Sequence, residues 1–247
     1  MATSTRKQRE IQAREELILD VGRRMLLERG FDGLTMDRVA GSIEYSKGTL
    51  YQHFASKEDL LAGIVAQTGG MRADLFERGA AYEGPTRERM AAIGVAFDLF
   101  SQLYPAHVQA QMIVTTEQLR NAEFREKLGA ERLSRIDANE QRCDMVMQSL
   151  MEEAVQDGHV TPAAAEALAA LHFGLWSVSF GAYMIMRCET DLAEKGFEDP
   201  VRLLHLAQDR MLDGFGWAPL SSEHDYVAAR ERILREVFPD EHRLALG

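Results

Sequence analysis

Apolar residues in the first part of the chain recur at helical spacing, in short segments separated by turn signals. A first helix is predicted over residues 12–29, and Gly30 follows it at the position where a helix end favours a left-handed residue. Thr35 and Ser46 can each cap the first turn of a helix, so two short helices are predicted to begin there. Ser56 opens a fourth helix with an acidic residue three positions later. Helices this short are unstable alone, so packing must hold them together.

Longer amphipathic stretches replace these short segments beyond residues 69–70. Further helices are predicted over residues 90–104, 106–120, 136–154, 162–186, 200–214 and 226–238. No segment shows the alternation of apolar and polar residues that is typical of a strand. The pattern therefore predicts an all-α chain, with a small helical domain followed by a larger one.

One predicted helix contains a run without charges, from Ala167 to Met186. Its length could just span a bilayer. However, the run contains His172, Ser177 and Ser179, and no basic clusters flank it. We therefore interpret it as a helix of the core or of an interface, apolar all round, rather than as a membrane span.

Cysteine usage and the N-terminal residues favour a cytoplasmic location. Cys143 and Cys188 form no CxxC arrangement, which argues against a disulfide scaffold and fits a reducing compartment. The N-terminal residues are polar and charged, without an apolar signal segment.

The net charge of −11 is unevenly distributed along the chain. Residues 1–60 contain ten basic and ten acidic side chains, whereas the remainder contains eighteen basic and twenty-nine acidic ones. Residues 1–9 include Arg6, Lys7 and Arg9 and no acid. The neutral N-terminal part could approach an anionic partner such as DNA, which the acidic remainder would repel.

Residues 35–57 combine two short helices, a tight turn and the start of a third helix, which is the pattern of a helix-turn-helix. In the second of these helices, Leu50 and Phe54 are expected to be buried. The opposite face carries small or slender donors that can reach base edges or phosphates in a major groove. The candidate DNA-binding residues are Thr35, Ser46, Lys47, Gly48, Thr49, Tyr51, Gln52, His53 and Lys57.

The same segment resembles the TetR family of transcriptional regulators. The resemblance depends on the Gly30–Phe31 step, Thr35, the run SKGTLY over residues 46–51, His53–Phe54, and Ser56–Lys57 with Leu60. It covers about residues 12–72, whereas the rest of the chain resembles the family only in length and helicity. Glu44 stands where the family often has glycine. If that position requires a positive φ, a non-glycine residue costs about 1 kcal/mol there.

The resemblance implies a ligand-relieved repressor that binds a palindromic double-stranded DNA operator as a homodimer. It implies contacts with DNA for Thr35, Thr49, Tyr51, His53 and Lys57. We expect a flexible basic arm over residues 1–11, a DNA-binding domain over 12–72 with its motif at 35–54, and a helical ligand-binding and dimerisation domain over 73–247. The charge-free helix, with Gly174 and Gly181 allowing close approach, and the helix over 200–214 are the candidate dimer helices.

A small-molecule effector would need a pocket with apolar walls and a few polar groups. The candidate lining residues, each of which could equally be ordinary core, are His107, Gln111, Met112, Met147, His172, Phe173, Trp176 and Tyr183.

Two other classes of function are an enzyme and a helical adaptor. An enzyme on a helical bundle lacks support, because the chain contains no GxSxG, HExxH, GxGxxG or P-loop motif. A helical adaptor would keep the bundle but would make no use of the exposed face over residues 47–57. No metal or cofactor is expected, since the seven histidines include no pair at i, i+4 and no cysteine partner at ligand spacing.

Overall fold

The computed structural model describes residues 2–120, 122–188 and 191–246, and within them the chain forms thirteen helices and no strand. The all-α prediction is therefore confirmed.

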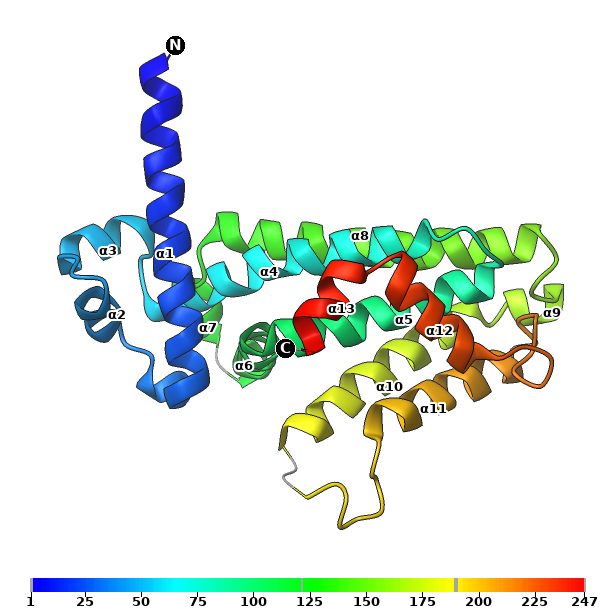
Figure 1. Ribbon diagram of the computed structural model, residues 1–247. Coiled ribbons are helices and arrows are strands. Elements are labelled where there is room, and N and C mark those ends of the chain that lie inside the picture. The colour runs from blue at the N-terminus through cyan, green and yellow to red at the C-terminus, as the bar shows by residue number, and fades with distance from the viewer. Residues whose placement is uncertain (1, 121, 189–190, 247) are drawn as a thin grey trace. The chain divides into compact units, whose positions relative to one another are not determined.

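The chain divides into two compact units, one formed by residues 1–71 and 104–140 and the other by residues 72–103 and 141–247. The first unit contains α1 (Ala2–Gly33), α2 (Met36–Ser42), α3 (Lys47–His53), the beginning of α4 (Lys57–Ala80), α6 (Pro105–Arg120), α7 (Ala122–Glu126) and the beginning of α8 (Ala130–Gln156). The second contains the rest of α4 and α8, with α5 (Thr86–Leu103), α9 (Pro162–Ala165), α10 (Leu168–Cys188), α11 (Pro200–Gly214), α12 (Tyr226–Glu236) and α13 (Pro239–Leu246) (Figure 1).

The first helix begins at Ala2 rather than near Gln12, so the segment expected to be a flexible basic arm belongs to α1. Residues 6–10 of this segment are good helix formers, and Arg6 pairs with Glu10 one turn later at 3.0 Å. As predicted, the helical backbone is interrupted at Gly30, which has φ 67° and ψ −176°.

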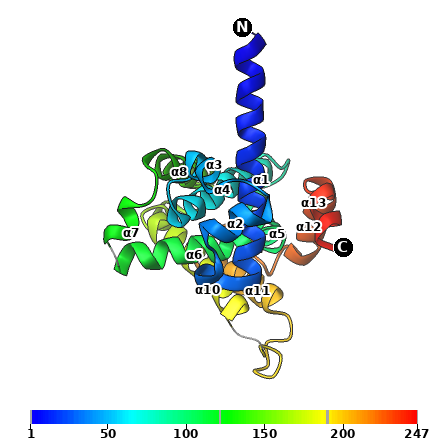
Figure 2. The same ribbon diagram turned by 90° about the vertical axis from the view of Figure 1, so that its left-hand side faces the viewer.

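The core of the first unit forms where α1, α2, α3 and α4 meet. Ile18, Leu26, Leu50 and Phe54 are fully buried, as the spacing of apolar residues predicted. Figures 1 and 2 show α2 and α3 packed beside the lower half of α1. The same core includes Ala110 and Val114 of α6, Phe124 of α7 and Ile136 of α8. This unit therefore extends beyond the domain expected at residues 12–72, because segments far along the sequence complete its core.

A network of buried charges ties the C-terminal segment of the second unit to α5 and α11. Arg87 is fully buried and donates to Asp213 at 2.6 Å and to the carbonyl of Asp209 at 3.0 Å. Arg230 of α12 donates to both carboxylate oxygens of Asp209 at 2.6 and 2.9 Å. Partial burial alone would raise the pKa of Asp213, but hydrogen bonds from Ser221 and Arg87 outweigh it and lower that pKa to about 2.

Helix α10 is long and apolar enough to cross a membrane by length and composition, and 17 % of its apolar window is buried. One side packs on α11 and α5, where Tyr183 donates to Asp98 at 2.7 Å. Another side leaves Phe173 and Trp176 exposed, at 65 % and 60 %. Of the two alternatives, a helix of the core or of an interface, the exposed face does not fit burial in the core of one chain, since no element of the described chain covers it.

Candidate nucleic-acid interface

Two hydroxyl caps fix the ends of the helix-turn-helix. The side chain of Thr35 accepts from the backbone N–H of Arg38 at 3.3 Å and begins α2. The side chain of Ser46 accepts from the N–H of Thr49 at 3.1 Å and begins α3. Each cap satisfies one N–H that would otherwise have no partner in the first turn, so both helices begin where the sequence predicted.

The turn between α2 and α3 requires a left-handed residue. Glu44 has φ 55°, a conformation that costs a non-glycine residue about 1 kcal/mol or more. The N–H of Tyr45 bonds back to the carbonyl of Ala40 at 3.0 Å and closes the turn. The conditional expectation for Glu44 is thus met: the turn is tight, and its strained position is occupied by an exposed acid.

Helix α3 buries one side and exposes the other. Leu50 and the C-cap residue Phe54 are buried in the core of the first unit. Facing away are the exposed or half-buried Lys47, Gly48, Thr49, Tyr51, Gln52 and His53. A Cβ added at Gly48 would meet nothing closer than the Ser46 hydroxyl, at 3.8 Å, so the surface there is open. This face matches the division that the sequence predicted.

Both candidate phosphate-binding lysines already have partners within the chain. The ammonium of Lys47 lies 2.6 Å from the carboxylate of Asp37 on α2, and this hydrogen bond raises the pKa of Lys47. The ammonium of Lys57 lies 4.0 Å from the centre of the Phe31 ring. Sequence reasoning missed both contacts. Only the ten-residue spacing of Asp37 and Lys47 across a predicted tight turn could have suggested the first.

The start of α4 is built as the sequence predicted and also bonds elsewhere in the unit. The N–H of Asp59 donates to the Ser56 hydroxyl at 3.0 Å, and the Asp59 carboxylate accepts from the N–H of Ala55 at 2.9 Å. The same carboxylate, which is buried, also pairs with Arg132 at 3.0 Å. Arg132 was not among the predicted site residues, because no local pattern marks a partner so distant in the sequence.

The candidate effector-pocket residues fall in different places. His107, Gln111 and Met112 belong to α6 of the first unit, where His107 is buried and bonded to Thr68. The other five belong to the second unit. Of these, Met147 lies in its core, Tyr183 is bonded to Asp98, and His172 is half-buried at 3.7 Å from Asp144.

Phe173 and Trp176, two of the candidate pocket residues, are exposed in the described chain. Both lie on the exposed face of α10, with ring centres 5.9 Å apart. Because α10 is apolar on every side, the sequence pattern could not distinguish its packed side from its open side. Gly174 allows α10 and α11 of the same chain to approach closely, since a Cβ there would meet the sulfur of Met211 on α11 at 2.9 Å.

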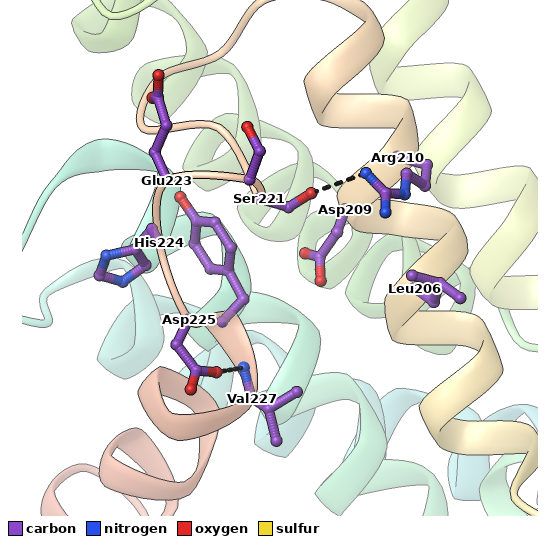
Figure 3. Close-up of a pocket in the computed structure, with 10 residues that line it drawn as sticks. Leu206, Asp209, Arg210, Ser221, Glu223, His224, Asp225 and Val227 are labelled. Carbon is purple, nitrogen blue, oxygen red and sulfur yellow. Dashed lines mark hydrogen bonds between the residues drawn. The ribbon is translucent and has the colours of Figure 1, made fainter.

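A pocket of about 480 Å³ lies between α11 and the beginning of α12 in the second unit (Figure 3). Its charged groups are paired with the chain itself: Asp209 with Arg230, and Asp225 with the N–H of Val227 at 3.0 Å. Arg210 donates to the Ser221 hydroxyl at 3.2 Å. None of the predicted pocket residues lines it. Among the residues that the structure describes, no three His, Cys, Asp or Glu side chains are grouped to hold a metal ion.

Known proteins are similar in sequence to the segment that contains the helix-turn-helix. The family model "Bacterial regulatory proteins, tetR family" matches residues 18–64. A helix-turn-helix regulator of Mycobacterium tuberculosis is 37 % identical over 76 residues, which are 27 % of this chain and 38 % of that protein. The regulator UidR of Escherichia coli is 40 % identical over 60 residues, which are 24 % of this chain and 31 % of UidR. The chain thus matches less than two fifths of the length of these relatives.

Solved structures share the fold over most of the chain. A tetR-family regulatory protein from Rhodococcus RHA1 has a TM-score of 0.57 and 18 % identity, and the alignment covers 83 % of this chain and 97 % of that one. A TetR/AcrR-family regulator from Thermobifida fusca has a TM-score of 0.57 and 22 % identity, with 82 % and 98 % covered. The family model thus assigns residues 18–64 to the tetR family of bacterial regulatory proteins, and most of the chain shares the fold of solved tetR-family structures.

Proposed function

We propose that this chain is a sequence-specific DNA-binding transcriptional regulator: a cytoplasmic, ligand-relieved repressor that binds a palindromic operator as a homodimer. The observation that supports this most directly is the outward face of α3. That helix is capped at Ser46, anchored in the core by Leu50, and presents slender donor side chains to solvent. A recognition helix needs this combination of a rigid support and a face that fits a major groove.

The donors on this face fall into two roles. Thr49 and Gln52 are proposed to read base edges, because an amide or hydroxyl can donate and accept at the edge of a base pair. Tyr51 and His53 are proposed to hold phosphates, which sets the register without reading sequence. Thr35, Ser46, Lys47 and Lys57 add phosphate contacts near the helix N-termini, and Gly48 allows the backbone to approach the DNA.

The apolar face of α10 and α11 supports the proposed homodimer. Phe173, Trp176 and Ile185 of α10 are exposed, and so are Leu203 and Leu206 of α11. Exposed large apolar side chains on these two helices would be covered by a second copy packing against them. Two recognition helices would then address half-sites about 34–36 Å apart. A small-molecule effector that changes this spacing would weaken binding, because the two half-sites could no longer be reached together.

Selection of bound duplexes from a random-sequence pool, at near-physiological salt, tests the proposal. We expect an enriched palindrome. Salt-sensitive binding without an enriched sequence would reject sequence specificity, because phosphate contacts alone produce salt-sensitive binding. A folded protein that binds no DNA would instead favour a helical adaptor that makes no use of the face over residues 47–57.

Two variants of neighbouring residues separate the proposed roles on α3. Tyr51→Phe removes one hydroxyl and is expected to weaken binding to all sequences alike, since its proposed partner is a phosphate. Gln52→Ala is expected to change the preferred base at one position of each half-site, with a loss of about 1–3 kcal/mol on the original operator. If both variants act identically across a library of sites, the assignment of roles is wrong.

A further inference from the structure

The guanidinium of Arg132, at the beginning of α8, contacts three helices of the helix-turn-helix region. It donates to the two Asp59 carboxylate oxygens at 3.0 and 3.1 Å, and to the carbonyl of His53 at 2.8 Å. It also lies 3.5 Å from the carboxylate of Glu15 on α1, and 4.3 Å from the centre of the Phe54 ring. Its side chain is only 15 % exposed, so it is directed into the unit rather than toward solvent.

Two of these contacts are with the C-terminal end of α3, the proposed recognition helix. His53 is the last residue of α3 and Phe54 is its C-cap. The last carbonyls of a helix have no partner within it and carry partial negative charge, so a buried cation stabilises them. Arg132 supplies that cation and packs against the cap residue at the same time.

A second set of bonds holds the same joint from the residues just before α8. The N–H of Gly129 donates to Asp59 at 3.1 Å, and the Ser56 hydroxyl donates to the carbonyl of Lys127 at 3.2 Å. A Cβ added at Gly129 would lie 2.5 Å from the Asp59 carboxylate, so Asp59 would have to shift to accommodate any other residue. We call Ser56, Asp59, Lys127, Gly129 and Arg132 the clasp.

The clasp depends on a carboxylate that is only 3 % exposed. Asp59 accepts from the N–H groups of Ala55 and Gly129 and from the guanidinium of Arg132. Removing the cation would leave a buried carboxylate without its counter-charge, which proteins tolerate poorly. The end of α3 would then lose its partner at the carbonyl of His53.

We propose that Arg132 is a positioning residue for DNA binding: through the clasp it fixes the C-terminal end of the recognition helix from a segment outside the helix-turn-helix. This inference rests on the proposed function. It assigns no contact with DNA to Arg132, which acts through His53 and Asp59.

Arg132→Met in the full-length protein tests the inference, with Arg142→Met as the matched control. Arg142 lies on the same helix and also pairs with two acids of α4, Asp74 at 2.6 Å and Glu77 at 2.8 Å, but it belongs to the second unit. Arg132→Met loses the ion pair with Asp59 of α4, and Arg142→Met loses those with Asp74 and Glu77 of α4. Only the first is expected to lower affinity for the selected operator, by about tenfold or more.

Two further readouts distinguish positioning from a general loss of stability. Without DNA, hydrogen–deuterium exchange over residues 47–54 should be faster in Arg132→Met than in wild type and unchanged in Arg142→Met. Affinity for a random duplex should fall less than affinity for the operator, and the salt dependence should keep its slope, because no phosphate contact is lost. A slope reduced by about one would overturn the inference in favour of a direct phosphate contact.

Conservative replacement provides the rescue. Arg132→Lys keeps a cation beside Asp59 but cannot direct a planar fork to Asp59 and His53 together, so its operator affinity should lie between those of wild type and Arg132→Met.

If Arg132→Met does not fold, Gly129→Ala replaces it, since the added Cβ displaces Asp59 without removing a charge. Operator affinity equal to wild type in the folded clasp variants would overturn the inference. If wild type itself binds no operator, the proposed function fails, and the exchange over residues 47–54 still decides whether Arg132 holds α3.

Discussion

Replacing Gly30 by alanine should destabilise the first unit through the backbone alone. Gly30 has φ 67° and ψ −176°, and a Cβ added there meets nothing within 4 Å. No steric contact therefore contributes to the cost. This region of φ and ψ is essentially restricted to glycine, and a side chain there costs about 1–3 kcal/mol. Alanine also reduces the freedom of the unfolded chain, which offsets about 0.4–1 kcal/mol.

The expected net loss is about 1–2 kcal/mol of unfolding free energy. Gly41 provides a control with the opposite sign, because it lies inside α2 and a Cβ there also meets nothing within 4 Å. Gly41→Ala should raise the unfolding free energy by about 0.5–1 kcal/mol, as alanine favours a helix. Two glycines with equally open surroundings should thus respond in opposite directions.

Urea denaturation followed by far-ultraviolet circular dichroism measures both variants. Trp176 and Trp217 lie in the second unit, so tryptophan fluorescence serves as a parallel record of that unit. A gain in stability for Gly30→Ala, or effects of the same sign for both variants, would refute the argument from backbone conformation.

Three further perturbations test other features of the structure. Glu44→Gly should raise the unfolding free energy by about 0.5 kcal/mol in the same urea titration, since relief of the left-handed strain exceeds the gain in freedom of the unfolded chain; a loss of stability would contradict this. Asp37→Asn should release Lys47 and increase both affinity for random duplexes and the salt slope, measured by fluorescence anisotropy, whereas an unchanged slope would show that Lys47 contacts no phosphate. Asp213 has its pKa lowered in the folded state, so its stabilisation of about 2 kcal/mol is complete above about pH 4 and disappears as the pH falls through about 2. Acid titration of Asp213→Asn should lack this component, and a titration curve parallel to that of wild type would contradict the assignment.

Local signals in the sequence were sufficient to predict the helix-turn-helix. The caps at Thr35 and Ser46 and the strained turn at Glu44 depend on bonds between residues within about one helical turn. The buried positions of Leu50 and Phe54 follow from the same short spacing. These features could be predicted from the sequence because the bonds that define them join residues that are close together in the chain.

The features that were not predicted depend either on partners far apart in the sequence or on a helix whose apolar residues do not indicate which side is buried. Arg132 and Asp59 are separated by 73 residues, so no local periodicity indicates that they meet. The start of α1 was placed too late because helix propensity is a weak signal beside a recognisable motif. The exposure of Phe173 and Trp176 could not be predicted, because α10 has apolar residues on all sides and shows no preferred face.

The first unit is formed by two separate stretches of the chain, and this affects the order in which its parts are synthesised. Residues 1–71 are synthesised before residues 104–140, although both stretches form one compact unit. At a synthesis rate of about 5–20 residues per second, Asp59 waits roughly 4 to 15 seconds for Arg132. Until then the nascent chain carries an acid without its counter-charge and apolar faces without their cover. The helix-turn-helix is encoded first, but it is completed only when the chain has grown about as far as the beginning of α8.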